Sequence, residues 1–267
     1  MKALRWPALV LAGWLLPAVS SAQVELFNGF PETVSGNQDE ILTFYLDVPA
    51  GITSLEFITT GGSGDADIYV NFGEPFLTSA DPTAECISVS DGDSEEYCVI
   101  EDPTPGLWYV EVYGFTAFAD VGLIGIAATE LANGEQRTIS GAFDSIQWYY
   151  VEVPAGQDQL SVNTGGGTGD PDLFVGTDLF GNPDCVSAEA STVESCQIGS
   201  PVAGRWYLLI YGFDAYSGVT LGAGYSTSGG GGGGGGALAP GALGVLLLTG
   251  LAGLGRRRLR GRPAPTP

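Results

Sequence analysis

Apolar and polar residues alternate along much of the central chain. Leu42, Phe44 and Leu46 fall on one face of a short segment, while Thr43 and Tyr45 fall on the other. Successive side chains of a β-strand point to opposite faces, so this period of two predicts a half-buried strand. The same alternation predicts further strands at 55–59, 67–72, 107–113, 121–126 and 149–153, with turn residues between them. Short strands at this spacing, without a helical stripe, indicate an all-β sandwich or barrel.

The central region also repeats itself. Val48-Pro49-Ala50-Gly51 recurs as 153–156 and Gly64–Val70 recurs as 169–175, both at an offset of 105. Beyond the cysteines the offset becomes 98, as in Gly106-Leu107-Trp108-Tyr109 and 204–207. We therefore predict two tandem domains, 23–128 and 129–228, and each has enough residues for a core of its own.

The cysteines fall two per copy. Cys86 and Cys98 belong to the first, and Cys185 and Cys196 to the second. Because each copy is expected to fold as a unit, we predict disulfides within the copies, each stabilising its domain by up to ~3 kcal/mol. Metal or redox chemistry is the alternative, but neither pair has the C-x-x-C spacing of such sites.

Residues 1–22 have the features of a secretory signal peptide. Lys2 and Arg5 precede an apolar stretch that ends in small residues at Ser20-Ser21-Ala22. The alternative is an N-terminal membrane anchor, which the short, proline-interrupted apolar run disfavours. Cleavage by signal peptidase would deliver the chain to an oxidising compartment, where disulfides persist.

The C-terminal region has three parts. Eight glycines at 229–236 form a predicted linker, 237–254 form an apolar helix just long enough to cross a membrane, and 255–267 form a basic cytoplasmic tail. This order resembles the GlyGly-CTERM sorting tail of bacterial surface proteins. The resemblance implies recognition by a rhomboid-type protease and cell-surface display. A permanent single-pass anchor is the alternative. The sorting tail would attach the chain to a membrane until it is cleaved, and the anchor would attach it permanently.

Charge and composition exclude several functions. The chain has 31 Asp and Glu against 9 Lys and Arg, and no histidine. Without an imidazole there is no Ser-His-Asp triad and no His-ligated zinc. Residues 23–228 contain only two arginines and no lysine, so this acidic region should repel nucleic acid. Divalent cations and cationic polymers fit such a surface, although a hydrated secreted surface explains it equally well.

The repeated motifs resemble those of the bacterial pre-peptidase C-terminal (PPC) domain. They are Val-Pro-Ala-Gly, Gly-Asp-x-Asp followed by an apolar strand, the cysteine pair, Gly-x-Trp-Tyr and Tyr-Gly-Phe, in the same order in both copies. The resemblance implies two jelly-roll-like β-sandwiches of a kind that is usually an appendage of secreted peptidases. There it is associated with secretion or with attachment to insoluble substrates. This sequence shows the modules without a peptidase.

Paired carboxylates are the candidate metal ligands. Asp65 with Asp67, and Asp170 with Asp172, suit Ca²⁺ when backbone carbonyls complete the shell. The alternative is that these side chains cap a glycine turn by accepting hydrogen bonds from nearby amides. The collagen-binding domains of clostridial collagenases are similar to PPC domains, and that resemblance adds Asp39 or Glu40 in the first copy and Asp144 in the second. The acidic linker of that family is missing here. The acidic segment 91–96 is predicted to be a solvated loop.

Aromatic residues near the strand ends are candidate ligand contacts. They are Tyr113, Phe115 and Phe118 in the first copy and Tyr211, Phe213 and Tyr216 in the second. Planar rings at such places stack on sugars or peptides in binding modules. Packing within the loops is the alternative. Trp108 and Trp206 are expected in the cores.

We therefore expect an exported, non-catalytic binding or adhesion module that acts on an extracellular polymer or protein. The first alternative is an accessory protein that aids the secretion or targeting of a separate extracellular peptidase. A glycosidase that uses an acid pair is the remaining alternative, and it requires two carboxylates at a fixed separation across a cleft.

Overall fold

The computed structural model describes residues 23–75, 84–178 and 183–227, which form two β-sandwiches and contain no helix. The predicted signal peptide at 1–22 and the predicted segments 229–236, 237–254 and 255–267 lie outside the described residues. Within the described residues, no helix is long and apolar enough to span a membrane. The all-β sandwich predicted from the alternation is confirmed.

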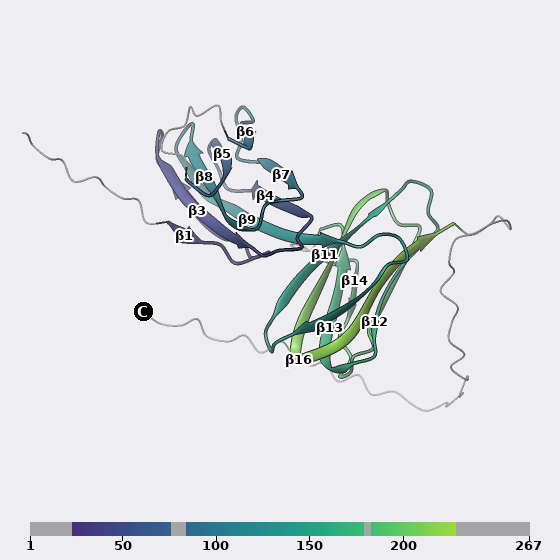
Figure 1. The fold of residues 1–267 in the computed structure, drawn as a ribbon. Helices are drawn as coiled ribbons and strands as arrows, with labels where there is room; N and C mark the ends of the chain where they lie inside the picture. The colour runs from purple at the N-terminus through teal and green to yellow at the C-terminus, as the bar shows by residue number, and fades with distance from the viewer. Residues whose placement is uncertain (1–22, 76–83, 179–182, 228–267) are drawn as a thin grey trace, which may run out of the picture. The chain divides into compact units, whose positions relative to one another are not determined.

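The first sandwich has two layers, which can be followed in Figure 1. One layer has the order β1-β3-β8-β5-β6, and the other pairs β2 with β9, β9 with β4 and β4 with β7. From β2 to β9, the first strand thus pairs with the last and the second with the next to last, which is the strand order of a jelly roll. The strands are β1 (Val24–Glu25), β2 (Glu32–Gly36), β3 (Ile41–Val48), β4 (Ser54–Thr60), β5 (Ala66–Phe72), β6 (Cys86–Ser88), β7 (Tyr97–Glu101), β8 (Gly106–Gly114) and β9 (Phe118–Glu130).

The second sandwich repeats this arrangement. Its strands are β10 (Gln136–Gly141), β11 (Ile146–Val153), β12 (Gln159–Gly165), β13 (Thr168–Gly176), β14 (Cys185–Ser187), β15 (Ser195–Gly199) and β16 (Gly204–Ser226). The long strand β16 corresponds to both β8 and β9 of the first sandwich. Its first part pairs with β11 and β13, and its last part pairs with β10 and β12. It therefore belongs to both layers.

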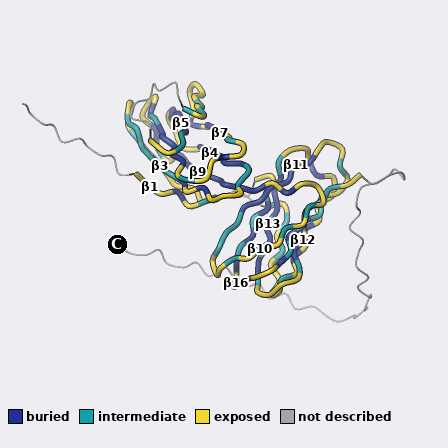
Figure 2. Tube along the Cα trace, viewed as in Figure 1, coloured by how far each residue is buried: buried dark blue, intermediate teal, exposed yellow. Residues whose placement is uncertain are grey.

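Each sandwich has a hydrophobic core supplied by the inward positions of its strands. Phe44, Leu46 and Val48 of β3 are buried, as the alternation predicts, and the corresponding side chains of β11 are buried too. The buried stretches run through the strands of both sandwiches in Figure 2. Trp108 and Trp206 lie in the two cores, and their indole N–H groups donate to the Thr104 and Val202 carbonyl oxygens at 2.8 and 3.0 Å. Burying these rings therefore leaves no unpaired donor.

The motif glycines are required by close packing at a turn. Gly64 and Gly169 have φ of +92° and +105°, a region that favours glycine. A Cβ atom at either position would lie 2.2 or 2.3 Å from the carbonyl oxygen of Ala117 or Ala215. The Gly-Asp-x-Asp motif therefore begins with a glycine for steric reasons, and this turn places the motif carboxylates at the start of β5 and in β13.

The sandwiches are joined inside one compact unit of the chain. β9 extends past the boundary predicted at residue 128, and its Thr129 and Glu130 pair in parallel with Tyr149 and Tyr150 of β11. A third hydrophobic cluster is formed by side chains of both sandwiches; its buried members are Ile124, Ile126, Ala128, Trp148 and Tyr150. The joint thus has both backbone pairing and apolar packing.

Candidate functional site

Each sandwich contains a cluster of buried or half-buried carboxylates. In the first, Asp65, Asp67 and Glu96 are 6%, 6% and 1% exposed. Burial raises the pKa of Asp67 to about 6, and the negative charges of Asp65, Glu96 and Asp91 act in the same direction. These carboxylates are therefore close enough to repel one another in a poorly solvated place.

The second sandwich repeats the cluster with Asp170, Asp172 and Glu194. Burial raises the pKa of Asp172 to about 6, and the charges of Asp170 and Glu194 add to the effect. Glu194 is fully buried, and burial also raises its pKa, although its hydrogen bonds with Ser187 and with the backbone of Glu189 oppose the shift. Glu96 and Glu194 were not among the predicted site residues.

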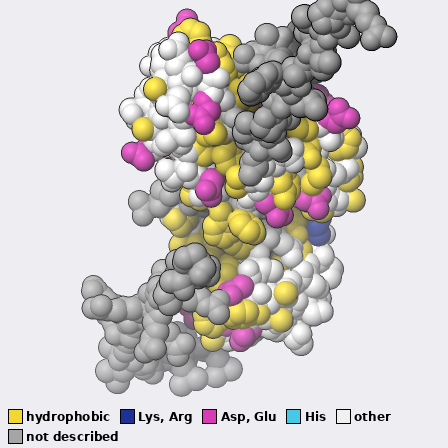
Figure 3. All heavy atoms as spheres, turned by 90° about the vertical axis from the view of Figure 1, so that its left-hand side faces the viewer, with side chains coloured by type: hydrophobic (Ala, Val, Ile, Leu, Met, Phe, Trp, Pro, Cys, Tyr) yellow, Lys and Arg dark blue, Asp and Glu magenta, His cyan; other side chains and the backbone are white. Residues whose placement is uncertain are grey.

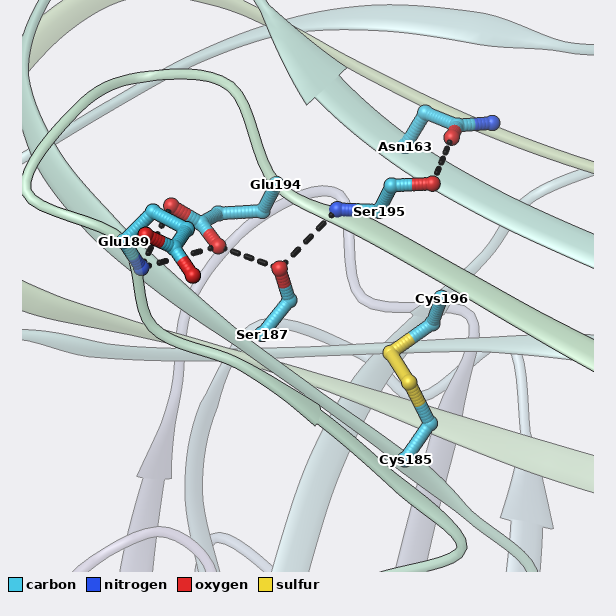
Figure 4. The surroundings of a disulfide bond; sticks show 7 residues. All are labelled: Asn163, Cys185, Ser187, Glu189, Glu194, Ser195 and Cys196. Carbon is cyan, nitrogen blue, oxygen red and sulfur yellow. Dashed lines mark hydrogen bonds between the residues drawn. A yellow bond between two sulfur atoms is a disulfide. The ribbon is translucent and has the colours of Figure 1, made fainter. Parts of the chain in front are cut away.

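The buried glutamates organise the disulfide loops. Glu194 accepts hydrogen bonds from the Ser187 hydroxyl at 2.5 Å and from the Glu189 backbone N–H at 3.1 Å, as Figure 4 shows. Glu96 accepts hydrogen bonds in the same way from the Ser88 hydroxyl and from the Ser90 N–H. The predicted disulfides Cys86–Cys98 and Cys185–Cys196 are confirmed.

The prediction of a solvated loop at 91–96 is wrong for Ser94 and Glu96, which are 3% and 1% exposed. The Glu96 N–H donates to the Thr59 hydroxyl at 3.0 Å, and the Thr59 N–H donates to the Glu96 carbonyl at 2.9 Å. Thr164 and Glu194 form the same reciprocal pair. In both sandwiches these bonds pair the backbone N–H and carbonyl groups of the buried glutamate, which lies two residues before a cysteine of the disulfide. The repeated pattern Cys-x-Ser and Glu-x-Cys is the sequence signal for this arrangement.

The predicted metal ligands Asp65, Asp67, Asp170 and Asp172 lie in these clusters. One oxygen of Asp65 accepts a hydrogen bond at 2.9 Å from the N–H of Gly92, which lies in the disulfide loop and not in the glycine turn beside Asp65. The Oδ1 atoms of Asp65 and Asp170 are buried and accept no hydrogen bond. Among residues 23–75, 84–178 and 183–227, no group of three or more His, Cys, Asp or Glu side chains is arranged to hold a metal ion. Calcium stays a prediction that would depend on backbone carbonyls and water.

Asp39 and Asp144 lie in equivalent turns of the two sandwiches. Both have positive φ, at 63° and 60°, and each accepts a hydrogen bond from a tyrosine hydroxyl. The Tyr113–Asp39 and Tyr211–Asp144 distances are 2.8 and 2.6 Å. The structure therefore brings two predicted metal ligands against two predicted ligand-contact tyrosines, and the bonds fix the turns that precede β3 and β11.

The remaining candidate aromatics divide into two kinds. Phe115 and Phe213 are 55% and 50% exposed. Phe118 and Tyr216 are 3% exposed and belong to the hydrophobic cores. Phe115 and Phe213 are thus open to a ligand, whereas Phe118 and Tyr216 pack inside the protein.

Arg205 forms the polar centre of the joint between the sandwiches. Its guanidinium lies 2.5 Å from Glu56 and 2.7 Å from Glu152. It also lies 3.9 Å from the centre of the Tyr150 ring, and the Tyr207 hydroxyl donates to Glu56 at 2.6 Å. Burial acts to lower the pKa of Arg205, but the hydrogen bond to Glu152 and the charge of Glu56 outweigh it and raise the pKa. Glu56 is fully buried, so Arg205 neutralises a charge that water cannot reach.

Acidic side chains are scattered over the face drawn in Figure 3, among hydrophobic and uncharged ones. The described residues contain Arg137 and Arg205 as their only basic side chains. Arg137 pairs with Glu135 at 3.0 Å and Arg205 is held in the joint. The acidic clusters therefore have no basic side chain of the described chain left to neutralise them.

The sequence matches the family described as "Bacterial pre-peptidase C-terminal domain" twice, over residues 40–114 and 145–212. The two matches fall on the two sandwiches and together cover just over half of the chain.

Two curated relatives are proteases. An alkaline serine exoprotease A of Vibrio alginolyticus is 36% identical over 93 residues, which is 33% of this chain and 17% of the relative. A neutral protease of Vibrio proteolyticus is 35% identical over 91 residues, which is 34% of this chain and 14% of the relative. The chain thus spans about a sixth or less of these relatives.

Among solved structures, the chain is similar to the periplasmic inhibitor of g-type lysozyme, PliG, from Aeromonas hydrophila. The TM-score is 0.31 at 14% identity, and the alignment covers 37% of this chain and 97% of the inhibitor.

Proposed function

We propose that this chain, which belongs to the bacterial pre-peptidase C-terminal domain family, is a non-catalytic accessory or binding module that works outside the cytosol. The observation that carries the proposal is the family match to both sandwiches. The relatives support it, because the chain corresponds to only a small part of each protease. The two disulfides fit an oxidising compartment.

In the first form of the proposal, the module binds an extracellular polymer or protein at the cell surface. The predicted signal peptide would export it, and the predicted glycine linker and apolar helix would hold it in the membrane until a rhomboid-type protease releases it. The exposed Phe115 and Phe213 support this form, because aromatic rings at a surface are suited to stacking on a ligand.

In the second form, the module assists a separate extracellular peptidase, either in secretion or in reaching its substrate. The similarity to parts of two proteases favours this form. The two forms predict different binding partners. An adhesion module binds a matrix directly, whereas an accessory module binds the peptidase.

Sedimentation with insoluble matrices tests the first form. The full chain is mixed with collagen, chitin or cellulose, with Ca²⁺ or with a chelator, and the bound fraction is measured after washing. We expect retention on at least one matrix, and Phe115→Ala combined with Phe213→Ala should reduce it. Absence of retention on all three would count against adhesion and leave the peptidase accessory as the proposal.

A hydrolysis screen tests the non-catalytic assignment. The full chain is incubated with peptide and polysaccharide substrates, and we expect no turnover. Turnover that is abolished by Asp67→Asn or Asp172→Asn would overturn the assignment in favour of the acid-pair glycosidase or another hydrolase.

A further inference from the structure

The outer face of the β3-β8-β5 layer in the first sandwich carries a row of polar and aromatic side chains. Along β8, Trp108, Val110 and Val112 are buried in the core, so the alternate residues Tyr109, Glu111 and Tyr113 lie on the opposite face of the sheet. Strand register places Thr43 of β3 and Tyr69 of β5 directly opposite Glu111. We call these residues, together with Tyr45, the Glu111 face.

Glu111 is a buried acid with an unpaired carboxylate oxygen. It is 2% exposed, and its Oε1 atom is buried and accepts no hydrogen bond. Burial raises its pKa to about 7. Residues 23–128 contain no lysine or arginine, so the first sandwich has no cation of its own to pair with this carboxylate. An unpaired buried carboxyl group costs stability, so its presence calls for a structural or functional explanation.

The joint between the sandwiches shows how this molecule satisfies a similar carboxylate. Glu56 is fully buried and accepts hydrogen bonds from the hydroxyls of Tyr97 and Tyr207 at 3.0 and 2.6 Å. The Arg205 guanidinium completes the arrangement by pairing with Glu56 and lying over the Tyr150 ring. A carboxylate among tyrosines is thus neutralised by an arginine that also contacts a ring.

The second sandwich uses the equivalent of the Glu111 face as a docking surface. With the offsets of the repeat, Thr43, Tyr45, Tyr109 and Glu111 correspond to Trp148, Tyr150, Tyr207 and Leu209. Those four residues are part of the hydrophobic cluster at the joint. Leu209 also lines a shallow hollow with Phe174, Pro183 and Tyr211, and Phe174 is the equivalent of Tyr69. The same surface therefore packs against the other sandwich in the second copy and carries a carboxylate with an unpaired oxygen in the first.

We propose that the Glu111 face binds an arginine side chain of a partner protein, with Glu111 as the anion and the neighbouring tyrosine rings as the stacking surface. The inference rests on the proposed binding function and names the chemistry of its ligand. Glu111 is already largely removed from water in the free protein, so much of the desolvation cost of an ion pair has been met before the partner arrives. A guanidinium suits the face better than an ammonium ion, because it is planar, less strongly hydrated and able to stack on aromatic rings.

The test uses the full chain and three short peptides. They are N-acetylated, C-amidated Gly-X-Gly peptides with X as arginine, lysine or citrulline, the last being a neutral analogue of arginine. Binding is followed by the chemical shifts of backbone amides in ¹⁵N-labelled protein. We expect the arginine peptide to shift amides of β3, β5 and β8 in a saturable way and to bind at least fivefold more tightly than the lysine peptide, with no saturation for citrulline.

Variants of the protein assign the effect to Glu111. Glu111→Gln keeps the shape of the side chain and removes the charge, and Glu111→Leu places there the residue that the second sandwich has at Leu209. Both should fold, and both should weaken binding of the arginine peptide at least fivefold. Glu32→Gln removes an exposed acid of β2 and should leave binding unchanged.

Three results would overturn the proposal: equal binding of arginine and citrulline peptides, equal binding of arginine and lysine peptides, or binding that survives both Glu111 variants. The adhesion proposal is tested by retention on a matrix, and it stands if Glu111→Gln is retained as well as the wild-type protein. The role of Glu111 is tested by binding of the arginine peptide alone. The two hypotheses therefore fail separately.

Discussion

The two sandwiches are built alike but present different outer faces. Both have the same strand order, a disulfide beside a buried glutamate and a tryptophan in the core. The face that the first sandwich offers to the joint contains Glu56, Ile58, Ile124 and Ile126. At the equivalent positions, the second sandwich has Ser161, Asn163, Gly222 and Gly224.

This difference shows that the interior fixes the fold of each copy, while a few outward positions fix how copies associate. Small and polar residues on the second sandwich offer neither the apolar area nor the buried carboxylate that the first sandwich uses.

The largest expected effect comes from breaking the joint. Arg205→Ala leaves Glu56 buried without its cation, which should cost about 3 to 5 kcal/mol of unfolding free energy. Arg137→Ala is the matched control, because its pair with Glu135 is partly exposed and should contribute less than about 1 kcal/mol. Urea denaturation of the full-length variants measures both. Similar losses for the two arginines would mean that the joint does not stabilise the fold.

Removing either disulfide tests whether the copies are equivalent inside. The linked cysteines are 12 residues apart in the first sandwich and 11 in the second. In the chain-entropy account, loops of this size give about 3 kcal/mol each. We therefore expect similar losses for Cys86→Ser with Cys98→Ser and for Cys185→Ser with Cys196→Ser, measured by thermal denaturation. A loss of stability for only one of the two double variants would show that the two disulfide loops contribute differently to the stability of their sandwiches.

Glu111 should make the first sandwich sensitive to pH in a way that the second is not, because Leu209 takes its place there. Its pKa is raised from 4.5 to about 7 by burial, so the folded state holds the proton more tightly than the unfolded state. This stabilisation is complete below about pH 4.5 and is lost as the pH rises through 7. Glu111→Gln should thus be more stable than wild type at pH 8, by up to about 3 kcal/mol, and nearly equal to it at pH 4.

Melting temperatures of both proteins between pH 4 and pH 8 measure the difference, and Glu32→Gln serves as the control for a general loss of negative charge. A gain for Glu111→Gln that is the same at both ends of this range would contradict the assignment to a buried carboxyl group.

The smallest effect is expected at the exposed rings. Phe115→Ala and Phe213→Ala remove side chains that are half exposed in both sandwiches, so each should change stability by less than about 0.5 kcal/mol. A loss of more than 1 kcal/mol of unfolding free energy, measured by calorimetry, would show that these rings stabilise the fold. Their exposure would then no longer support a role as ligand contacts.

Much of the fold follows from local sequence patterns. The strand around Phe44 and the disulfide Cys86–Cys98 were predictable because alternation and repeated spacing are short-range features. The burial of Glu96 was missed, since an acid in a polar loop is usually solvated, and only its serine and amide partners make burial tolerable.

The joint was harder to predict because it depends on contacts between distant residues. Arg205 and Glu56 are separated by 149 positions. Neither has an equivalent in the other copy, where Leu107 and Ser161 stand. Such departures from the repeat carry the signal. Arg205 is one of only two basic residues within 23–228, and Glu56 is an acid inside an apolar strand; together they mark the positions at which the copies meet.

The long strand β16 has a mechanical consequence. It ends at Ser226 after pairing with four other strands across both layers of its sandwich. A displacement of β16 would therefore disturb backbone pairing in both layers at once, and neither layer of the second sandwich can lose this strand without the other.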